Sequence, residues 1–202
     1  SMMDIGMIIG SGGVLSHAPD RKAAALMILD AFEPQGITEL CVDSIFMMPH
    51  LGVLSSVCPD AAQQIFERDC LVYLGTSICP AGGNPKLGAP LLKYRVEGAA
   101  PASGTLLCGG LVRVELQQGA SAQVTLEPAN RAVDVGAGPG KPVARALRGG
   151  HAGLMLDGRG RPLLLPEEGA ERAAANKRWM EAFGLELPET LTAETQRTQR
   201  TA

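Results

Sequence analysis

Aromatic side chains are scarce in this chain of 202 residues, in which Phe, Trp and Tyr together account for 3%. Proteins that bind single-stranded nucleic acid stack bases on aromatic rings, so this scarcity argues against that class. An excess of one charge is also missing, since 18 basic and 21 acidic residues leave a net charge of −3. Such a balance supplies no electrostatic attraction to nucleic acid or to an anionic membrane. We expect neither as a partner.

Segments that would export the chain or anchor it in a membrane are missing as well. No run approaches the ~18 consecutive apolar residues of a membrane span. The start, Ser1-Met2-Met3-Asp4, has no basic segment followed by an apolar one, so it is not a signal peptide. We expect a cytoplasmic protein.

Closely spaced cysteines and clustered metal ligands do not occur in the sequence. The five cysteines are odd in number and widely spaced: Cys41, Cys58, Cys70, Cys79 and Cys108. We expect them to be reduced and buried as small hydrophobic side chains. His17, His50 and His151 lie far from one another along the chain, so no metal site is predicted.

Glycine and proline are plentiful, with 25 and 14 residues, which predicts many turns and short elements. Residues 7–9 read as a buried strand that runs into a glycine turn. Asp20 is placed to begin a helix that ends before Pro34. Further helical stretches are expected from Asp43 or Ser44 through residue 54, and from residue 59 to residue 70. This part predicts an α/β unit over residues 1–75.

The remainder of the chain favours strands. A β-rich region is expected over residues 76–165, with a closing helix over 166–184 and a flexible tail over 185–202. The pair Asp157-Gly158 lies between two apolar runs, 153–156 and 162–165, and predicts a hairpin. Arg159 and Arg161 would then be exposed on its tip.

The glycine turn at Gly10, Ser11, Gly12 and Gly13 is the first candidate site. Residues without Cβ let a flat ligand lie against the backbone and bond to its N–H groups, but a plain strand-to-helix turn needs the same residues. The turn matches neither G-x-G-x-x-G nor a phosphate loop. Ser16 and His17 are not by themselves a nucleophile and base, because a triad also needs an orienting acid.

The sequence predicts structural roles for two histidines and leaves two alternatives for Asp43. His17 is expected to shape the turn into the following helix, and His50 to pack in an apolar stretch. Asp43 either caps its helix or faces the edge of a ligand, and the sequence does not separate these two roles.

Residues 8–16, Ile-Ile-Gly-Ser-Gly-Gly-Val-Leu-Ser, resemble the adenosine motif of the actin-like ATPase superfamily. Further segments in order and spacing resemble the C-terminal portion of the MutL accessory protein family of glutamate mutase: residues 36–40, 51–54, 74–82, 134–140 and 156–163. The resemblance covers most of residues 5–183.

The resemblance implies a partial actin-like ATPase subdomain, ribonuclease H-like in fold, followed by the β-rich region and the C-terminal helix. It implies contacts of Gly10, Ser11, Gly12 and Gly13 with ATP or ADP. It also implies an ATP-dependent chaperone or reactivating factor whose partners are the subunits of an adenosylcobalamin-dependent mutase.

One departure from the superfamily concerns the phosphates. Its phosphate- and magnesium-binding motifs lie upstream of the adenosine motif, and nothing before Met7 could supply them. We therefore expect a C-terminal fragment that lacks its N-terminal ATPase half. Such a fragment cannot stabilise phosphoryl transfer, and it should bind nucleotide weakly or not at all and no metal.

A second glycine loop, with Asp134, Gly136, Gly138 and Gly140, leaves three alternatives open. It resembles the first motif of S-adenosylmethionine-dependent methyltransferases, with Asp157 imitating the acidic residue that bonds the ribose. Too few strand-helix units follow for that fold, so this alternative is disfavoured. The loop could otherwise let two backbones cross closely, or recognise a nucleotide or partner. At the level of function, a non-catalytic binding or scaffold module of a mutase complex remains the alternative to the ATPase.

Overall fold

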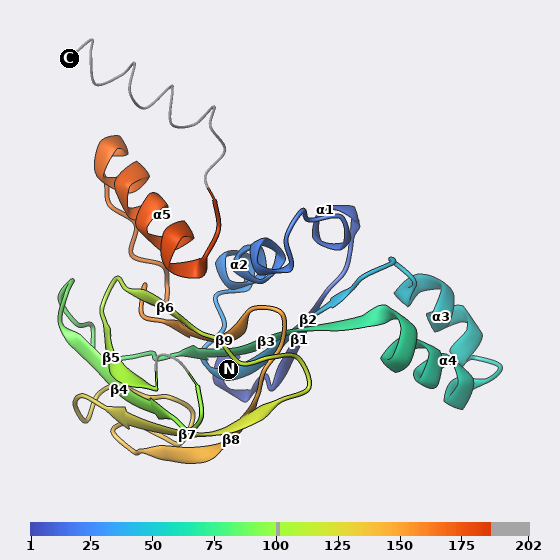
Figure 1. Cartoon of the computed structure of the whole chain (residues 1–202), viewed down its shortest axis with the longest axis horizontal. Coiled ribbons are helices and arrows are strands. Elements are labelled where there is room, and N and C mark those ends of the chain that lie inside the picture. Colours follow the sequence, from blue (N-terminus) through green and yellow to red (C-terminus); the bar gives the residue numbers. More distant parts are fainter. Residues whose placement is uncertain (100–101, 187–202) are drawn as a thin grey trace, which may run out of the picture.

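The structure, a computed structural model, describes residues 1–99 and 102–186 and is a mixed α/β protein with two sheets (Figure 1). The tail expected over residues 185–202 lies outside the described residues from residue 187 onward. Helices lie over one face of the larger sheet, and the smaller sheet lies over its other face (Figure 1).

The larger sheet has five strands in the order β1-β2-β3-β9-β6. After a short turn of helix at Met2–Asp4, strand β1 spans Met7–Gly10 and pairs in parallel with β2, Gly36–Asp43. Helices α1, Gly13–Ser16, and α2, Arg21–Phe32, connect these two strands. The connection confirms the predicted strand, glycine turn and helix.

Strand β3, Leu71–Cys79, lies at the centre of the larger sheet, antiparallel to β2 and parallel to β9, Gly153–Asp157. Strand β6, Leu111–Val114, pairs with β9 at the edge. All residues of β9 are buried because both faces of the sheet are covered. The boundary expected between residues 75 and 76 falls within β3, and strands from both sides of it share this sheet.

The smaller sheet is antiparallel throughout, in the order β5-β4-β7-β8. Its strands are β4, Pro90–Val96, β5, Ser103–Leu107, β7, Ser121–Pro128, and β8, Val143–Arg148. Alternate residues of β4 and β7 are buried, as the alternation of apolar residues predicts. They pack against the larger sheet through side chains such as Leu154 and Leu156 of β9.

The opposite face of the larger sheet is covered by α2 and by α5, Gly169–Phe183, which contribute Ile28, Trp179 and Phe183 to one apolar cluster. Met155 joins this cluster while its neighbours in β9 join the other, as expected for a strand buried on both faces. The indole N–H of Trp179 donates to Gly109 O at 2.8 Å. The predicted closing helix is therefore present and packed onto the sheet.

Two short helices, α3, Met48–Ser55, and α4, Pro59–Ile65, form a hairpin that extends away from both sheets (Figure 1). A π-helical turn at Phe66–Cys70 leads from it back into β3. His50 is exposed in this hairpin, so its predicted packing in an apolar environment is wrong.

Two predictions about secondary structure are also wrong. Residues 36–43 form β2, where no strand was predicted. The helix expected from Asp43 or Ser44 through residue 54 is present as α3 but begins only at Met48. The polar residue Thr38 interrupts the apolar pattern by which a buried strand would be predicted. In the structure Thr38 is buried, and its hydroxyl donates to Ile5 O at 3.0 Å.

The hairpin predicted around Asp157-Gly158 is not formed, because β9 pairs with β3 and β6 and no strand follows it in the described part of the chain. A Cβ on Gly158 would lie 2.4 Å from Leu107 O, so glycine is needed there for close approach and not for a turn. Arg159 and Arg161, expected on an exposed tip, are instead buried, with side chains 2% and 1% exposed.

Candidate functional site

The glycine turn lies at the carboxyl end of β1, where the chain passes from Gly10 into α1. Gly12 precedes the helix with a φ of +122°, a conformation that favours glycine. In the described part of the chain, no atom outside the turn's own adjoining backbone lies within 4 Å of the position that a Cβ would take on Gly12 or Gly13. A Cβ on Gly10, by contrast, would meet Leu15 and Ile28 at 2.6 and 2.9 Å. The open part of the turn is therefore Gly12 and Gly13, and the side of Gly10 where a Cβ would lie is filled by the core.

Asp43 joins this turn to the start of α3. Because β1 and β2 are parallel, their carboxyl ends meet, and the Ser11 hydroxyl donates to Asp43 Oδ2 at 3.3 Å. The N–H groups of Met47 and Met48 donate to the same carboxylate at 3.1 and 2.8 Å. The structure shows the first of the two roles that the sequence left open, since Asp43 accepts from the N–H groups that lead into α3. Asp43 also borders the glycine turn, and a contact with a ligand there remains a prediction.

The pKa of the Asp43 carboxyl is set by two opposing effects. Burial alone would raise the pKa, but the N–H groups of Met48 and Met47 and the Ser11 hydroxyl hold it below its usual value. Asp43 is consequently a fixed negative charge at neutral pH, and its oxygens are committed to protein donors.

Exposed apolar side chains lie in the segments that follow the two strand ends. Val14, in α1, is 76% exposed, and Phe46, between Asp43 and α3, is 48% exposed. Phe46 has a φ of +56°, which is unfavourable for an aromatic residue. The bonds from Met47 and Met48 to Asp43 hold the chain in this strained conformation. Strain of this kind is typical of functional sites.

Ser16 and His17 form the end of α1 and do not make a catalytic pair. The Ser16 hydroxyl donates to Gly12 O at 3.0 Å, and His17 Nδ1 lies 3.0 Å from Gly13 O. The two side chains are 3.1 Å apart, yet no carboxylate hydrogen-bonds to His17 among the described residues. The expected role of His17 in shaping the turn is confirmed.

The second glycine loop lies at the other end of β1 and β2. The N–H groups of Gly136 and Gly138 donate to Asp134 Oδ1 at 2.7 and 3.0 Å, so this carboxylate holds its own loop. A Cβ on Gly36, the first residue of β2, would lie 3.5 Å from the Cα of Gly136. These contacts favour the reading in which glycines let two backbones cross closely.

The two glycine motifs are therefore not brought together. The Gly136 loop borders a cavity of about 320 Å³ that also contacts Gly6, before β1, whereas Gly12 and Gly13 follow the carboxyl end of β1. A Cβ on Gly140 would meet Arg131 Cα at 2.8 Å, so Gly140 also permits close packing. A role of Asp134, Gly136, Gly138 and Gly140 in cofactor binding remains a prediction.

Asp157 is part of a buried ion-pair network that the sequence did not indicate. The guanidinium groups of Arg159 and Arg161 donate to its carboxylate at 2.8 and 2.9 Å, and Arg159 also pairs with Asp30 at 2.7 Å. Its oxygens are thus used by protein donors, which weighs against the ribose contact that a methyltransferase would need. Strand β8 follows the Gly136 loop where that fold requires a helix.

Comparison with known proteins gives one match. Residues 1–70 match the family described as MutL protein, which confirms the predicted resemblance to that family over this part of the chain. The matched residues include the glycine turn, Asp43 and the α3–α4 hairpin. No curated protein and no solved structure gives a significant match. Among the described helices, none is long and apolar enough to cross a membrane.

Proposed function

We propose that this chain is the C-terminal portion of an ATP-dependent chaperone or reactivating factor for an adenosylcobalamin-dependent mutase, with Gly10–Gly13 as the adenosine-contacting half of its nucleotide site. The match of residues 1–70 to the MutL family supports an accessory role beside glutamate mutase. The observation that carries the nucleotide site is the open backbone at Gly12 and Gly13, where no other part of the described chain lies within 4 Å of a Cβ position.

The arrangement of β1, α1, α2 and β2 supports the actin-like lineage that we propose. Two parallel strands joined by a glycine turn and a helix place the turn at a carboxyl strand end, where open α/β sheets bind ligands. Strand β1 lies at the edge of the sheet, where a further strand from an N-terminal half could pair with it.

Phosphoryl transfer requires more than this half-site. The γ-phosphate needs positioned cations and donors, and Ser11 and Asp43 are bonded to each other. Nucleotide can drive the opening of a mutase complex only through different affinities for its open and closed states. We therefore assign ATP turnover to the assembled protein and predict none for these 202 residues alone.

A non-catalytic scaffold module is the second candidate, and one observation favours it. The α3–α4 hairpin exposes Val53 and Val57 by 73% and 85%, together with Phe46 just before α3. Contiguous exposed apolar patches mark surfaces that bind other proteins, and this alternative requires these side chains to form one. In this alternative the hairpin binds a mutase subunit, and the glycine turn has no ligand.

Gly13→Leu separates the two candidates. The φ of Gly13 lies outside the left-handed range and its Cβ position is free, so leucine should leave the fold intact. Its side chain should cover the open backbone at Gly12 and Gly13. Gly169→Leu is the matched control, because Gly169 is the first residue of α5, has equally free space and lies outside both the glycine turn and the α3–α4 hairpin. The measurement is ATP-dependent recovery of glutamate mutase that has been inactivated by turnover, using the product of the complete reading frame.

If Gly12 and Gly13 contact adenosine, Gly13→Leu should lower recovery by at least about tenfold, while Gly169→Leu leaves it unchanged. Equal recovery in both variants would contradict the nucleotide site. For the 202-residue chain alone, phosphate release that follows the protein through purification would contradict the proposal that it is catalytically incomplete.

A further inference from the structure

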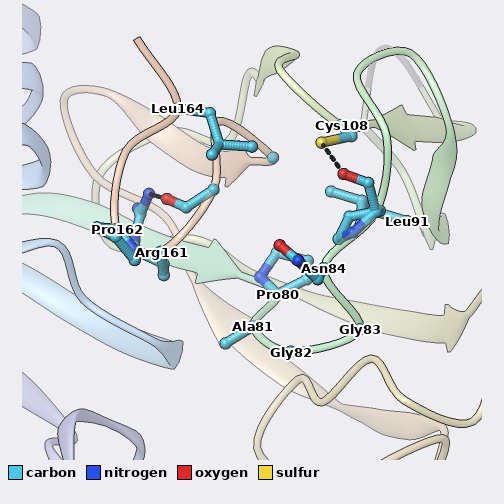
Figure 2. Close-up of a pocket in the computed structure, with 13 residues that line it drawn as sticks. Pro80, Ala81, Gly82, Gly83, Asn84, Leu91, Cys108, Arg161, Pro162 and Leu164 are labelled. Atoms are coloured by element: carbon cyan, nitrogen blue, oxygen red, sulfur yellow. Dashed lines mark hydrogen bonds between the residues drawn. The ribbon is translucent and has the colours of Figure 1, made fainter.

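A second cavity lies outside the carboxyl ends of two other parallel strands, β3 and β9 (Figure 2). Its volume is about 300 Å³. The loop after β3, with Pro80, Gly82 and Asn84, forms one wall, and the segment after β9, with Arg161 and Leu164, forms another (Figure 2). Crevices at the carboxyl ends of parallel strands are the usual ligand sites of such sheets.

Backbone donors without protein acceptors lie in the first wall. The N–H groups of Gly82, Gly83 and Asn84 donate to no acceptor within residues 1–99 and 102–186. These residues have φ values of +83°, +75° and +37°. A Cβ on Gly82 would lie 2.5 Å from Ala132 O, so that side of the loop is packed. All three residues are exposed and line the cavity, so their peptide groups are open to a ligand there, and backbone N–H groups of this kind bind anions.

Arg161 adds a donor from the opposite wall. Its Nε donates to Pro34 O at 2.7 Å, and its Nη2 to Cys79 Sγ and Asp157 Oδ2 at 3.1 and 2.9 Å. Nη1 makes one bond within the described chain, to Gly160 O at 2.7 Å. A guanidinium carries five N–H groups, so one hydrogen of Nη1 is left over. The side chain is 1% exposed, which makes this donor fixed and desolvated.

Among residues 1–99 and 102–186, no acidic residue lines the cavity to oppose an anion. The nearest carboxylate in the network, Asp157, is neutralised by Arg159 and Arg161. The remaining lining is apolar or compact, and includes Leu91, Pro162 and Leu164. At the volume of ~30 Å³ that a water occupies in the liquid, the cavity holds about ten water-sized groups.

We propose that this cavity binds a small organic oxyanion, a carboxylate or a phosphate ester with a short apolar chain. The oxyanion accepts from the N–H groups of Gly82 to Asn84 and from Arg161 Nη1, while the apolar chain lies against Leu91 and Leu164. The site is separate from the glycine turn at Gly12 and does not depend on the nucleotide proposal.

The test is a titration of the ¹⁵N-labelled chain by NMR with four probes: acetate, butyrate, inorganic phosphate and propyl phosphate. Saturable shifts are expected at the amides of Gly82, Gly83 and Asn84. Butyrate or propyl phosphate should bind more tightly than the matching short anion, and the tighter of the two identifies the headgroup. Butyramide, which has the same chain without charge, should not saturate.

Leu164→Trp fills the cavity from a position that is 44% exposed, and should weaken binding by about tenfold. Leu165→Trp is the matched control, since Leu165 is 51% exposed and does not line the cavity. Leu164→Phe replaces the first variant if tryptophan disturbs the remaining amide spectrum. Binding that survives cavity filling in a folded variant, equal binding of butyramide, or no saturable shift with any probe would each overturn the proposal.

Discussion

Arg159 Nη2 donates to Asp157 Oδ2 at 2.8 Å, and both side chains are sealed from solvent. The same guanidinium reaches Asp30 on α2 at 2.7 Å and lies 5.2 Å from the ring centroid of Trp179 on α5. One arginine thus connects the end of β9 to both helices that cover the sheet. The segment after β9, which was predicted to be an exposed turn, instead forms a buried ion-pair network.

Asp157→Asn should destabilise the protein strongly. The substitution removes the charge that two buried guanidinium groups share, and breaking a buried pair in this way costs about 3–5 kcal/mol. Urea unfolding followed by tryptophan fluorescence measures the change at Trp179. Asp69→Asn is the control, because Asp69 pairs with Arg68 at 2.7 Å on the surface and should change stability little. Equal effects of the two substitutions would contradict this account.

The lowered pKa of Asp157 predicts how stability depends on pH: the free energy of unfolding should fall toward acid pH. Burial would raise the pKa of Asp157, but the bonds and charges of Arg159 and Arg161 hold it below its usual value. Its contribution is therefore complete above the pKa of unfolded aspartate, ~3.9, and is lost as the pH falls through the lower native pKa. Unfolding free energies measured from pH 6 downward should fall, with a smaller slope in Asp157→Asn.

Asp30 should have the opposite effect on the pH dependence of stability, because its pKa is raised. Asp30 is only half-buried, with a side chain 49% exposed, and this partial burial raises its pKa more than Arg159 lowers it. Its ionisation therefore costs stability as the pH rises above ~3.9. Asp30→Asn should steepen the fall of stability toward acid pH, and an unchanged slope in both variants would exclude this network as the source.

Much of the fold could be predicted from local signals, and the exceptions have physical causes. Asp20 does begin α2, since its Oδ1 accepts from Lys22 N at 2.8 Å, and such caps depend only on neighbouring residues. The buried turn after β9 could not be found this way. Asp157 and Arg161 are neighbours in sequence, but their burial depends on Asp30 and Pro34, more than 120 residues away.

The candidate site could be predicted in part. The glycines of the first turn and Asp43 were identified, because both follow apolar runs. That Asp43 bonds Ser11 could not be inferred, since it requires β2 beside β1, and β2 itself was missed. The cavity after β3 and β9 was missed for a similar reason: its two walls, residues 80–85 and 158–164, are distant in the sequence and meet only when the strands pair in parallel.

Asp43→Ala should loosen the segment between β2 and α3. Removing the carboxylate leaves the N–H groups of Met47 and Met48 without this acceptor. A fully buried unmade bond costs about 1–3 kcal/mol, so these part-buried bonds should cost at most that much each. Ser11→Ala removes only one hydroxyl at 3.3 Å and should cost less. Hydrogen exchange at Met47 and Met48 should accelerate in Asp43→Ala and remain slow in Ser11→Ala. Slow exchange in both variants would show that Asp43 does not hold the loop.

The thiols should separate sharply in reactivity. Cys58 is exposed, while Cys41, Cys70, Cys79 and Cys108 are buried. Burial raises the pKa of Cys41 and of Cys79 to about 12, so neither forms the reactive thiolate at neutral pH. Ellman's reagent should modify one thiol rapidly in the native protein and all five after unfolding, and Cys58→Ser should abolish the rapid phase. Rapid loss of a second thiol would contradict the burial described above.

The exposed valines of the α3–α4 hairpin predict an effect on mutase binding that does not involve the nucleotide site. Val53 and Val57 are 73% and 85% exposed on a hairpin that extends from the sheets, so burying them against a partner would gain free energy at no cost to the fold (Figure 1). Val53→Asp and Val57→Asp should leave thermal unfolding unchanged, and should weaken binding of glutamate mutase subunits by about tenfold in surface plasmon resonance.

Gln64→Asp, on α4, is the matched control for this hairpin, since it adds the same charge at an exposed polar position. It should bind mutase as the unsubstituted chain does, because no apolar side chain is lost. If all three aspartate variants weaken binding equally, added charge and not the apolar surface is responsible. If none does, the mutase contacts another face, and the exposed valines are free to serve contacts with the N-terminal half that we propose.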